Sequence, residues 1–301
     1  LLALTDPDGL RGDARRAADD YRNSGGVIEM FQGDLPASAA LLVDALLASG
    51  HDMVVLTAAS MDYPEFRSTC WVRIEDVVED RIPTQREGGR DDGVADRFEQ
   101  WLAERADGAP PFFAFVQLDG PHQAYDFPEE HAVFEPYADG LRYLEIAGGQ
   151  APEEVELIFN RYRNSVHYVD AVIARLYAAL EAEGLAESTL FVVTGDHGEG
   201  LGDHGEVTHG SLAYDTTLRV PLIVRWPGKI EAGSVSDHIS AFWDFLPTAC
   251  EIADIEFEIE TDGISYLPEL LGGSQPEHDY LYWEFQEQGK KQAVRKGNWK
   301  A

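Results

Sequence analysis

The stretch SVHYVDAVIARLYAALEAEGLAESTLFVVTGDHG, residues 165–198, joins a helical pattern directly to an apolar run of strand length. Apolar residues recur every three or four positions through residues 153–183, which predicts one long amphipathic helix that closes at Gly184. The run STLFVVTGDHG then predicts a buried strand that ends in a glycine-rich turn. A long helix that leads into a buried strand is typical of an α/β protein.

The same alternation of helices and strands extends toward the N-terminus. The patterns predict helices at residues 37–50 and 93–107 and strands in HDMVVLTAAS, PPFFAFVQLDGPH and, further on, RVPLIVRWPG. Strands separated by helices favour a mostly parallel sheet that is covered on both faces. We therefore expect one large α/β domain over residues 1–232.

The pattern changes over residues 233–301. One helical run, FWDFLPTACEIADI, is expected to be kinked at Pro247. Two further runs, DYLYWEF and KQAVRKGNW, predict paired antiparallel strands around QEQGK. A small C-terminal antiparallel subdomain is the expected outcome.

The composition is that of a globular but very acidic protein. Of the 301 residues, 44% are apolar and 11% aromatic, and 55 acidic residues outnumber 23 basic ones, for a net charge of -32. Such a charge repels nucleic acid and anionic lipid, which we exclude as partners. The acids are spread along the chain, which favours a solvated surface suited to high salt over general cation binding.

The ends of the chain and its cysteines carry less information. No run reaches the roughly 18 apolar residues that a membrane span requires, and the chain begins without Met. We expect a fragment or a processed form, whose membrane association would come only from segments absent from this chain. Cys70 and Cys250 have no metal-type spacing and are expected to be buried apolar residues without a disulfide.

Asp196 and His197 stand at the carboxyl end of the strand predicted at residue 190 onward, where ligand sites of parallel sheets form. A carboxylate beside an imidazole suits a divalent cation. His204 and His209 follow on the same loop, so three of the nine histidines fall within thirteen residues. A solvated glycine-rich loop is the alternative, and this clustering favours a functional site over it.

Two other segments contain candidate polar groups. His122 follows the strand-like run FFAFVQLDG, so it is expected at the same edge of the sheet, where it could protonate a leaving group or contact an anionic oxygen. A turn histidine stacked on Tyr125 or Phe127 is the alternative. Asp6 and Asp8 end the apolar start LLALT and could add carboxylates to the cation, or form an ordinary Asp-Pro turn.

Several of these motifs, in this order, resemble the sulfatase branch of the alkaline-phosphatase superfamily. The resemblance rests on SVHYVDAVIARLYAALEAEGLAESTLFVVTGDHGEGLGDHG, on THGSLAYDTTLRVPLIVRWPGKI and on the hairpin YLYWEFQEQGKKQAVRKGNWKA. Upstream, GGVIEMFQGDLPASAALLVDALLASGHDMVVLT and FFAFVQLDGPHQAYDFP are more similar to bacterial inner-membrane sulfatase-like proteins. The similarity spans residues 26–301.

The resemblance implies an alkaline-phosphatase-like α/β sandwich and one divalent metal ion, Ca²⁺, Mg²⁺, Mn²⁺ or Zn²⁺. Asp196 and His197 match the family's metal pair, and Asp6 and Asp8 could match its N-terminal metal ligands. His122 matches a histidine that contacts the transferred group, and His209 falls where the family places a Lys or His near it. A sulfate or phosphate ester, small or linked to a glycan or lipid, is the implied substrate, and a periplasmic or extracytoplasmic location is implied.

The chain departs from the family at the nucleophile. Neither Cys70 nor Cys250 lies in the C-x-P-S-R or S-x-P-S-R motif that yields formylglycine, and Ser24, in YRNSGG, is the hydroxyl candidate. We expect a metal-dependent sulfatase-family hydrolase. The alternatives are a non-catalytic sulfatase-like binding or regulatory domain, and a phosphoethanolamine- or phosphoglycerol-type transferase at a membrane surface.

Overall fold

The computed structural model describes residues 41–62, 66–67, 70–140, 152–206, 208–210, 213–255, 261–285 and 291–301. Its first sheet has the order β2-β1-β3, with β1 at Asp52–Thr57, β2 at Val78–Glu79 and β3 at Phe112–Gln117. Both neighbours run parallel to β1. The expected parallel sheet is therefore confirmed in this part of the chain.

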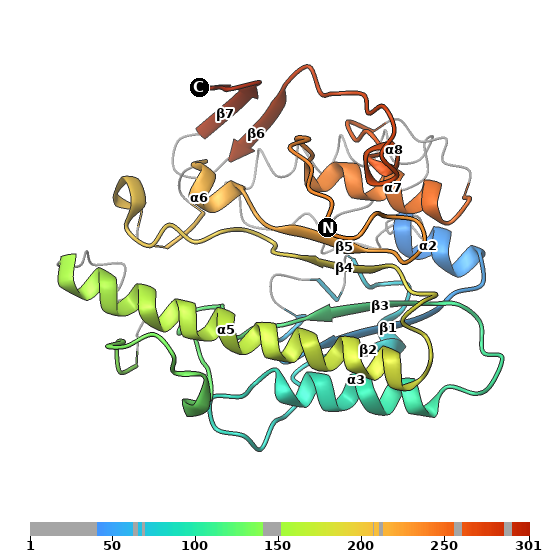
Figure 1. The fold of residues 1–301 in the computed structure, drawn as a ribbon, viewed down its shortest axis with the longest axis horizontal. Coiled ribbons are helices and arrows are strands. Elements are labelled where there is room, and N and C mark those ends of the chain that lie inside the picture. Colours follow the sequence, from blue (N-terminus) through green and yellow to red (C-terminus); the bar gives the residue numbers. More distant parts are fainter. Residues whose placement is uncertain are drawn as a thin grey trace.

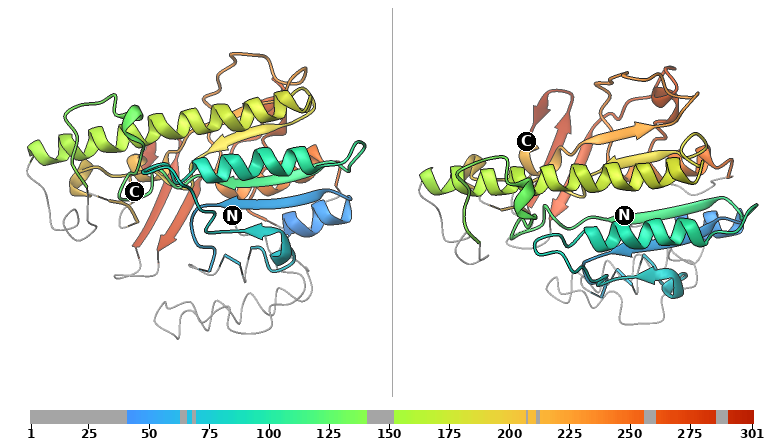
Figure 2. Two further views of the ribbon diagram at one scale, coloured as in Figure 1. Left: turned by 90° about the horizontal axis from the view of Figure 1, so that it is seen from below. Right: turned by 60° about the horizontal axis from the view of Figure 1, so that its bottom comes forward.

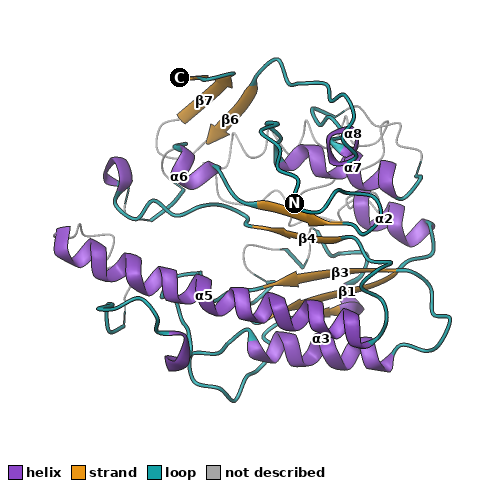
Figure 3. Cartoon of the chain, viewed as in Figure 1, coloured by secondary structure: helices purple, strands orange, loops and turns teal. Residues whose placement is uncertain are grey.

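Helices cover both faces of this sheet (Figures 1 and 3). On one face lie α3 (Asp92–Glu104) and α5 (Pro152–Ala182), and on the other α2 (Leu41–Ala48) and α7 (Phe245–Ile252). Each predicted helix is found, and the ends of α3 and α5 lie within three residues of the predicted ones.

The side chains of β1 explain this layering because successive residues of a strand point to opposite faces. Val54 and Leu56 pack into a core with residues of α3 and α5. Met53 and Val55 pack into a second core with residues of α2 and α7. A strand buried on both faces shows no alternation of polar and apolar residues, as observed in MVVL.

A second sheet continues the molecule beyond α5. It pairs β4 (Phe191–Thr194) with β5 (Leu222–Arg225) in antiparallel register, with Phe191 opposite Arg225. Between them the chain forms a 3₁₀ turn at Asp203–Gly205 and the short helix α6 at Asp215–Leu218. The residues described between these two strands contain no long crossover helix, so the strands can pair antiparallel. The α/β fold thus combines parallel and antiparallel pairs.

The C-terminal hairpin is confirmed and extended by one strand. β6 (Leu281–Phe285) pairs antiparallel with β7 (Lys291–Lys296), and β7 pairs with β8 (Trp299–Lys300). The run KQAVRKGNW was expected to be one strand, but it turns at Gly297, which has a φ of 57°. Glycine and asparagine are the residues that such two-residue turns require.

The helical run near Pro247 also differs from its prediction. Residues Phe242–Asp244 form a 3₁₀ turn, and α7 begins at Phe245, so Pro247 lies in the first turn of the helix. The missing N–H of a proline costs nothing there, which is why α7 is not kinked at this residue.

The remaining elements are short: the 3₁₀ turns Glu75–Val77 and Glu129–His131 and the helix α8 at Leu267–Leu270. Cys70 and Cys250 are both buried and neither forms a disulfide, as expected. No helix within the described ranges is long and apolar enough to cross a membrane. Leu246 and Cys250 of α7, which follow residue 232, pack in the same core as the residues of α2, which precede it. The predicted boundary between two domains after residue 232 stays a prediction.

Candidate functional site

Two loops leave the molecule on the same side because β3 and β4 run in the same direction (Figure 1). The His122 loop, residues 118–127, follows β3, and the Asp196 loop, residues 195–210, follows β4. Figure 2 shows the same arrangement from two further directions. The sequence predicted both loops at one edge of a single sheet, whereas the structure assigns β3 and β4 to separate sheets whose strands point the same way.

The Asp196 loop folds back on itself through glycines that approach other backbone atoms closely. The N–H of Gly198 donates to Thr217 of α6 at 2.9 Å, and a Cβ on Gly198 would lie 1.9 Å from the carbonyl oxygen of Thr216. The N–H of Gly200 donates to the carbonyl of Thr208 at 2.7 Å. Glycine at these positions lets the end of the loop return to its start.

This return stacks His209 on His197, with ring centroids 3.9 Å apart and planes inclined by 31°. Two histidines that are twelve positions apart in the sequence are thus in direct contact in the fold. His204, by contrast, stacks on Tyr214 at 3.9 Å and lies 3.0 Å from Asp203, so it does not join this pair.

The carboxylate of Asp196 lies close to both the backbone N–H and the imidazole ring of His197. Oδ1 of Asp196 accepts the backbone N–H of His197 at 2.9 Å, and Oδ2 lies 3.6 Å from Nε2 of the same residue. Nδ1 of His197 lies 2.7 Å from the carbonyl oxygen of Gly198. A carbonyl oxygen only accepts, so Nδ1 carries the proton and a neutral ring keeps its lone pair on Nε2, beside the carboxylate.

These two side chains fit a divalent cation as an oxygen and a nitrogen donor. The Asp196 side chain is 82% exposed, so its second oxygen is open to a ligand. Within the described part of the chain no three His, Cys, Asp or Glu side chains gather as a complete metal site. The other predicted ligands, Asp6 and Asp8, lie outside the described residues, as does Ser24.

Glu199 is a site residue that the sequence did not single out. Its side chain is only 7% exposed, and both of its carboxylate oxygens lie 3.3 Å from Nδ1 of His209. This hydrogen bond raises the pKa of His209, against the effect of burial, and the charges of Asp196 and Glu206 raise it too. A nearby carboxylate thus stabilises the protonated form of this imidazole, beside the candidate metal pair.

Tyr125, in the His122 loop, packs in a cluster that also contains a residue of the Asp196 loop. It is fully buried and packs edge-on against Tyr162 of α5 at 5.4 Å, in a cluster that also contains Leu201 of the Asp196 loop. Burial raises the pKa of the Tyr125 hydroxyl, and the nearby charge of Glu199 raises it further. Glu199 thus has His209 on one side and a neutral phenol on the other.

The His122 loop is held by a buried carboxylate. Asp91 is 0% exposed and accepts the backbone N–H groups of Asp119 and Gly120, each at 2.8 Å. Arg161 of α5 donates to the carbonyl oxygen of Ala124 at 2.8 Å and pairs with Asp126 at 3.2 Å. These contacts fix the backbone on both sides of His122.

His122 itself is exposed. No ring contact to Tyr125 or Phe127 is found in the described ranges, where Phe127 packs against Tyr137 instead. Equally, no hydrogen bond or ring contact there joins His122 to Asp196, His197 or His209. His122 shares their edge of the fold, and its role stays a prediction.

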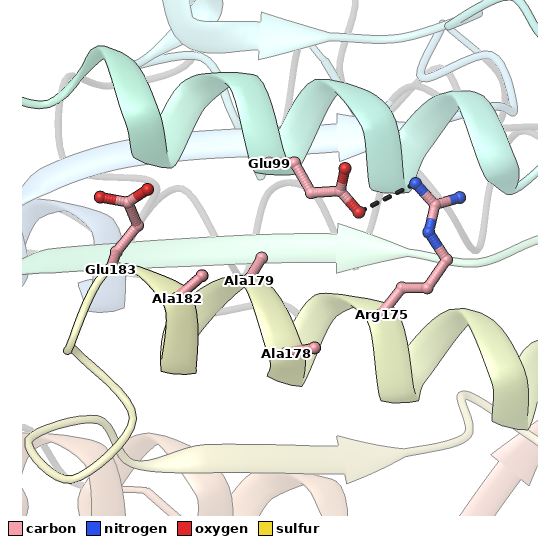
Figure 4. A pocket seen from close by; sticks show the side chains of 6 residues that line it. All are labelled: Glu99, Arg175, Ala178, Ala179, Ala182 and Glu183. Carbon is pink, nitrogen blue, oxygen red and sulfur yellow. Dashed lines mark hydrogen bonds and ion pairs between the residues drawn. The ribbon is translucent and has the colours of Figure 1, made fainter.

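A groove between α3 and α5 lies away from these loops (Figure 4). Its lining residues are Glu99, Arg175, Ala178, Ala179, Ala182 and Glu183. Arg175 already pairs with Asp92 at 3.0 Å, Asp96 at 2.7 Å and Glu99 at 2.8 Å. A cation so fully paired offers little to an anionic ligand, so the candidate site remains at the Asp196 loop.

Comparison with known proteins identifies the family of the chain. The family model described as sulfatase matches residues 48–255. An arylsulfatase of Clostridium perfringens is 27% identical over 203 residues, covering 60% of this chain and 42% of that protein. An N-acetylglucosamine-6-O-sulfatase of Bacteroides thetaiotaomicron is 36% identical over 130 residues, covering 41% and 23%.

A solved structure, the phosphonate monoester hydrolase of Agrobacterium radiobacter, superposes with a TM-score of 0.68 at 21% identity, covering 88% of this chain and 72% of that one. At this identity the likeness concerns the fold, which is the alkaline-phosphatase-like α/β sandwich that the sequence motifs implied. The chain spans less than half the length of the two curated relatives.

Proposed function

The chain belongs to the sulfatase family, and from that premise we propose that it is a metal-dependent hydrolase of sulfate esters, with related phosphate esters as further substrates. The observation that carries the proposal is the Asp196–His197 pair, whose carboxylate and Nε2 lie 3.6 Å apart at the end of β4. Beside it, Nδ1 of His209 lies 3.3 Å from the buried carboxylate of Glu199, which raises the pKa of His209.

In this proposal Asp196 and His197 hold one divalent cation, together with Asp6 and Asp8. A bound cation supplies Lewis acidity to the ester oxygens and lowers the pKa of a nearby hydroxyl. Carboxylate and imidazole donors are compatible with Ca²⁺, Mg²⁺, Mn²⁺ and Zn²⁺ alike.

The other side chains act on the transferred group. His209, whose pKa is raised by its hydrogen bond to Glu199, offsets negative charge on the sulfuryl oxygens when it is protonated. His122 protonates the leaving oxygen, a role that its place at the same edge of the fold supports. Asp91 and Arg161 act through the backbone by positioning the His122 loop.

The nucleophile is assigned to Ser24 as the hydroxyl candidate. Its oxygen would attack the sulfur, the bond from sulfur to the leaving oxygen would break, and water would then hydrolyse the covalent intermediate. A sulfatase-like binding domain is the second candidate, and the feature that favours it is that no C-x-P-S-R or S-x-P-S-R motif stands within these 301 residues.

Sulfated sugars are the substrate class that we favour, because one relative is named for its action on an N-acetylglucosamine 6-O-sulfate. The phosphonate monoester hydrolase fold likeness supports testing phosphorus esters as well. Action at a periplasmic or extracytoplasmic face, including transfer of a phosphoethanolamine or phosphoglycerol group, stays part of the proposal to be tested.

The decisive assay compares an aryl sulfate, an aryl phosphate monoester and an aryl phosphodiester on protein loaded in turn with Ca²⁺, Mg²⁺, Mn²⁺ and Zn²⁺. We expect hydrolysis of the sulfate to be fastest. Faster turnover of the diester would favour the transferase, and no turnover of any substrate would contradict the hydrolase and favour the binding domain.

Metal binding can be tested without turnover. Ligands that bind only the folded state stabilise it by about 2.7 kcal/mol at a hundredfold excess over Kd. Chelator should therefore lower the melting temperature of the purified chain, and the four cations should restore it to different degrees. Identical melting curves in chelator and in all four cations would contradict the metal site.

A further inference from the structure

Two histidines outside the candidate site face each other between a loop segment and a helix. His131 is the last residue of the 3₁₀ turn Glu129–His131, and His167 lies in α5. Their Nδ1 atoms are 3.2 Å apart, and their ring centroids are 5.2 Å apart. The chemistry proposed at the Asp196 loop involves neither of them.

A buried side chain of α5 holds the segment that carries His131. Asn164 is 0% exposed, and its Oδ1 accepts the backbone N–H groups of Val133 at 3.0 Å and Phe134 at 2.8 Å. Its Nδ2 donates to the carbonyl oxygen of Phe134 at 3.1 Å. Asn164 precedes His167 by three positions, so both side chains lie on the same side of α5. The fold therefore fixes the two backbones that carry the imidazoles.

The contacts of this segment with α5 continue beyond Asn164. The Nδ2 of Asn160 donates to the carbonyl oxygen of Pro136 at 3.0 Å, and the N–H of Ala138 donates to the carbonyl oxygen of Leu157 at 3.1 Å. Figures 1 and 2 show the segment, in green, running beside the helix. The segment at residues 128–138 is thus docked on α5 along its length.

The ring of His131 also packs on a rigid neighbour. Its centroid lies 5.3 Å from that of Tyr168, which is 1% exposed. The hydroxyl oxygen of Tyr168 accepts the backbone N–H of Asp92 at 2.9 Å. A side chain that is already packed in this way loses little freedom when it binds a ligand, which favours binding.

The separation of the two nitrogens fits a shared metal ion. Bonds from zinc to imidazole nitrogen are about 2.0–2.1 Å long, so two nitrogens 3.2 Å apart subtend an angle of about 100–106° at one ion. This angle is close to that of tetrahedral coordination. A hydrogen bond between the two Nδ1 atoms is the alternative at the same distance.

We propose that His131 and His167 bind one transition-metal ion, Zn²⁺, Ni²⁺ or Cu²⁺, through their Nδ1 atoms. Imidazole is a ligand that these ions favour, whereas Ca²⁺ and Mg²⁺ prefer oxygen. The ion links the segment that follows the His122 loop to α5. This site depends neither on the proposed function nor on Asp196 and His197.

The carboxylates around the pair leave the choice of ion to the imidazoles. The charges of Glu130 and Asp92 act on His131, but Glu130 pairs with Arg86, and Asp92 pairs with Arg86 at 2.9 Å and with Arg175 at 3.0 Å. No third His, Cys, Asp or Glu joins the pair within the described ranges, so water completes the coordination. We expect Cu²⁺ to bind most tightly, Ni²⁺ and Zn²⁺ less so, and Mn²⁺ most weakly.

Calorimetric titration of the purified chain with Ni²⁺, in an excess of Ca²⁺ and Mg²⁺, tests the pair. These two cations compete for oxygen donors and leave two imidazoles open. We expect His131→Gln and His167→Gln each to weaken the binding of one Ni²⁺ ion by at least about tenfold, because loss of even an outer partner of a metal ligand costs about 10–100-fold. His167 is exposed, so His167→Gln should melt like the parent when no metal is added.

His51→Gln is the matched control. His51 is partly buried, as His131 is, but its Nδ1 lies 2.8 Å from Oγ of Ser49 and not beside a second imidazole. It should bind Ni²⁺ as the parent does. Equal Ni²⁺ affinity in the parent, His131→Gln and His167→Gln would overturn the proposal and leave the pair as a hydrogen bond. An equal loss in His51→Gln would overturn it as well.

Repeating the titration on Asp196→Asn separates this site from the proposed active site. We expect Asp196→Asn to keep the Ni²⁺ ion that His167→Gln loses, and loss of that ion in Asp196→Asn would contradict the assignment. A parent chain that hydrolyses an aryl sulfate but binds Ni²⁺ equally in all the histidine variants retains the proposed function and refutes this inference. A chain that hydrolyses no ester but loses one Ni²⁺ ion in His167→Gln does the reverse.

Discussion

Asp91 illustrates how a single buried residue can support a loop that contains a candidate catalytic group. Its carboxylate accepts two backbone N–H groups ahead of His122, and Tyr168 and Val169 of α5 pack beside the turn at Gly120. Burial raises the pKa of Asp91 from 3.8 to about 6, although the two N–H groups lower it. The folded protein therefore keeps a proton on Asp91 at pH values where the unfolded chain has released it.

This difference predicts a pH dependence of stability. Between pH 3.8 and about 6 the folded state binds more protons than the unfolded state, so the Asp91 contribution to the unfolding free energy decreases as the pH rises. The total change should be about 3 kcal/mol, at about 1.4 kcal/mol for each unit of the pKa shift. Asp91→Asn should remove it, so the stability lost on mutation should be greatest near pH 4 and smallest above pH 7.

Urea unfolding at pH 4.5, 5.5, 6.5 and 7.5 measures this trend. Asp237→Asn, at an exposed aspartate, is the control. An Asp91→Asn effect that does not vary with pH would show that Asp91 does not keep its proton in the folded state.

Sequence reasoning found some site residues and missed others for a physical reason. Asp196, His197 and His209 lie on one loop after a recognisable strand, and the fold does bring His209 onto His197. Glu199 and Tyr125 act through contacts that depend on the tertiary fold. Nothing in the local pattern of a chain so rich in acids distinguishes Glu199 from the other 54 acidic residues.

The Asp196 loop and α6 behave as one element because their backbones touch. Gly198→Ala would place a Cβ 1.9 Å from the carbonyl oxygen of Thr216, whereas a Cβ on Gly195 would meet its nearest atom at 3.4 Å. Such overpacking costs about 1–3 kcal/mol. We expect Gly198→Ala to lower the melting temperature and reduce ester hydrolysis, and Gly195→Ala to keep the parent's melting temperature.

Both variants can be compared by thermal melting and by the aryl sulfate assay. Equal melting temperatures for the two would mean that the loop does not pack against α6 as described. Loss of stability in Gly195→Ala alone would contradict the assigned geometry even more directly.

The spacing of apolar residues predicted where the helices and strands lie, but it did not predict how the strands pair. The patterns predicted α3 and α5 because their apolar stripes face the sheet. The antiparallel pairing of β4 with β5, and the turn at Gly297 that creates β8, depend on partners elsewhere in the chain. A strand-like run does not reveal the direction of its neighbour.

The whole molecule is a layered α/β sandwich with a strongly acidic composition. Its architecture could be predicted because β1 and β3 are apolar on both faces and alternate with helices, which leaves few other arrangements. Its charge is a separate property. Many described arginines are already paired with acids, for example Arg97 with Glu79 at 2.7 Å and Arg105 with Asp52 at 2.9 Å.

The remaining acidic charges repel one another, and salt screens that repulsion. We therefore predict that the urea unfolding midpoint rises as KCl is increased from 0.1 to about 2 M, where the screening length falls to roughly 2–3 Å. Sucrose at matched osmolality controls for general solute effects. A midpoint that is flat or falls with KCl would contradict adaptation of this surface to high salt.

The central claim is that Asp196 and His197 form the metal end of a sulfatase active site. Its most direct measurement is the rate of aryl sulfate hydrolysis by metal-loaded Asp196→Asn, compared with Glu187→Gln, an exposed acid that pairs only with Arg225 at 3.1 Å within the described residues. The account predicts loss of at least about 100-fold in kcat/KM for Asp196→Asn and an unchanged rate for Glu187→Gln. Equal activity of Asp196→Asn and the parent would contradict it.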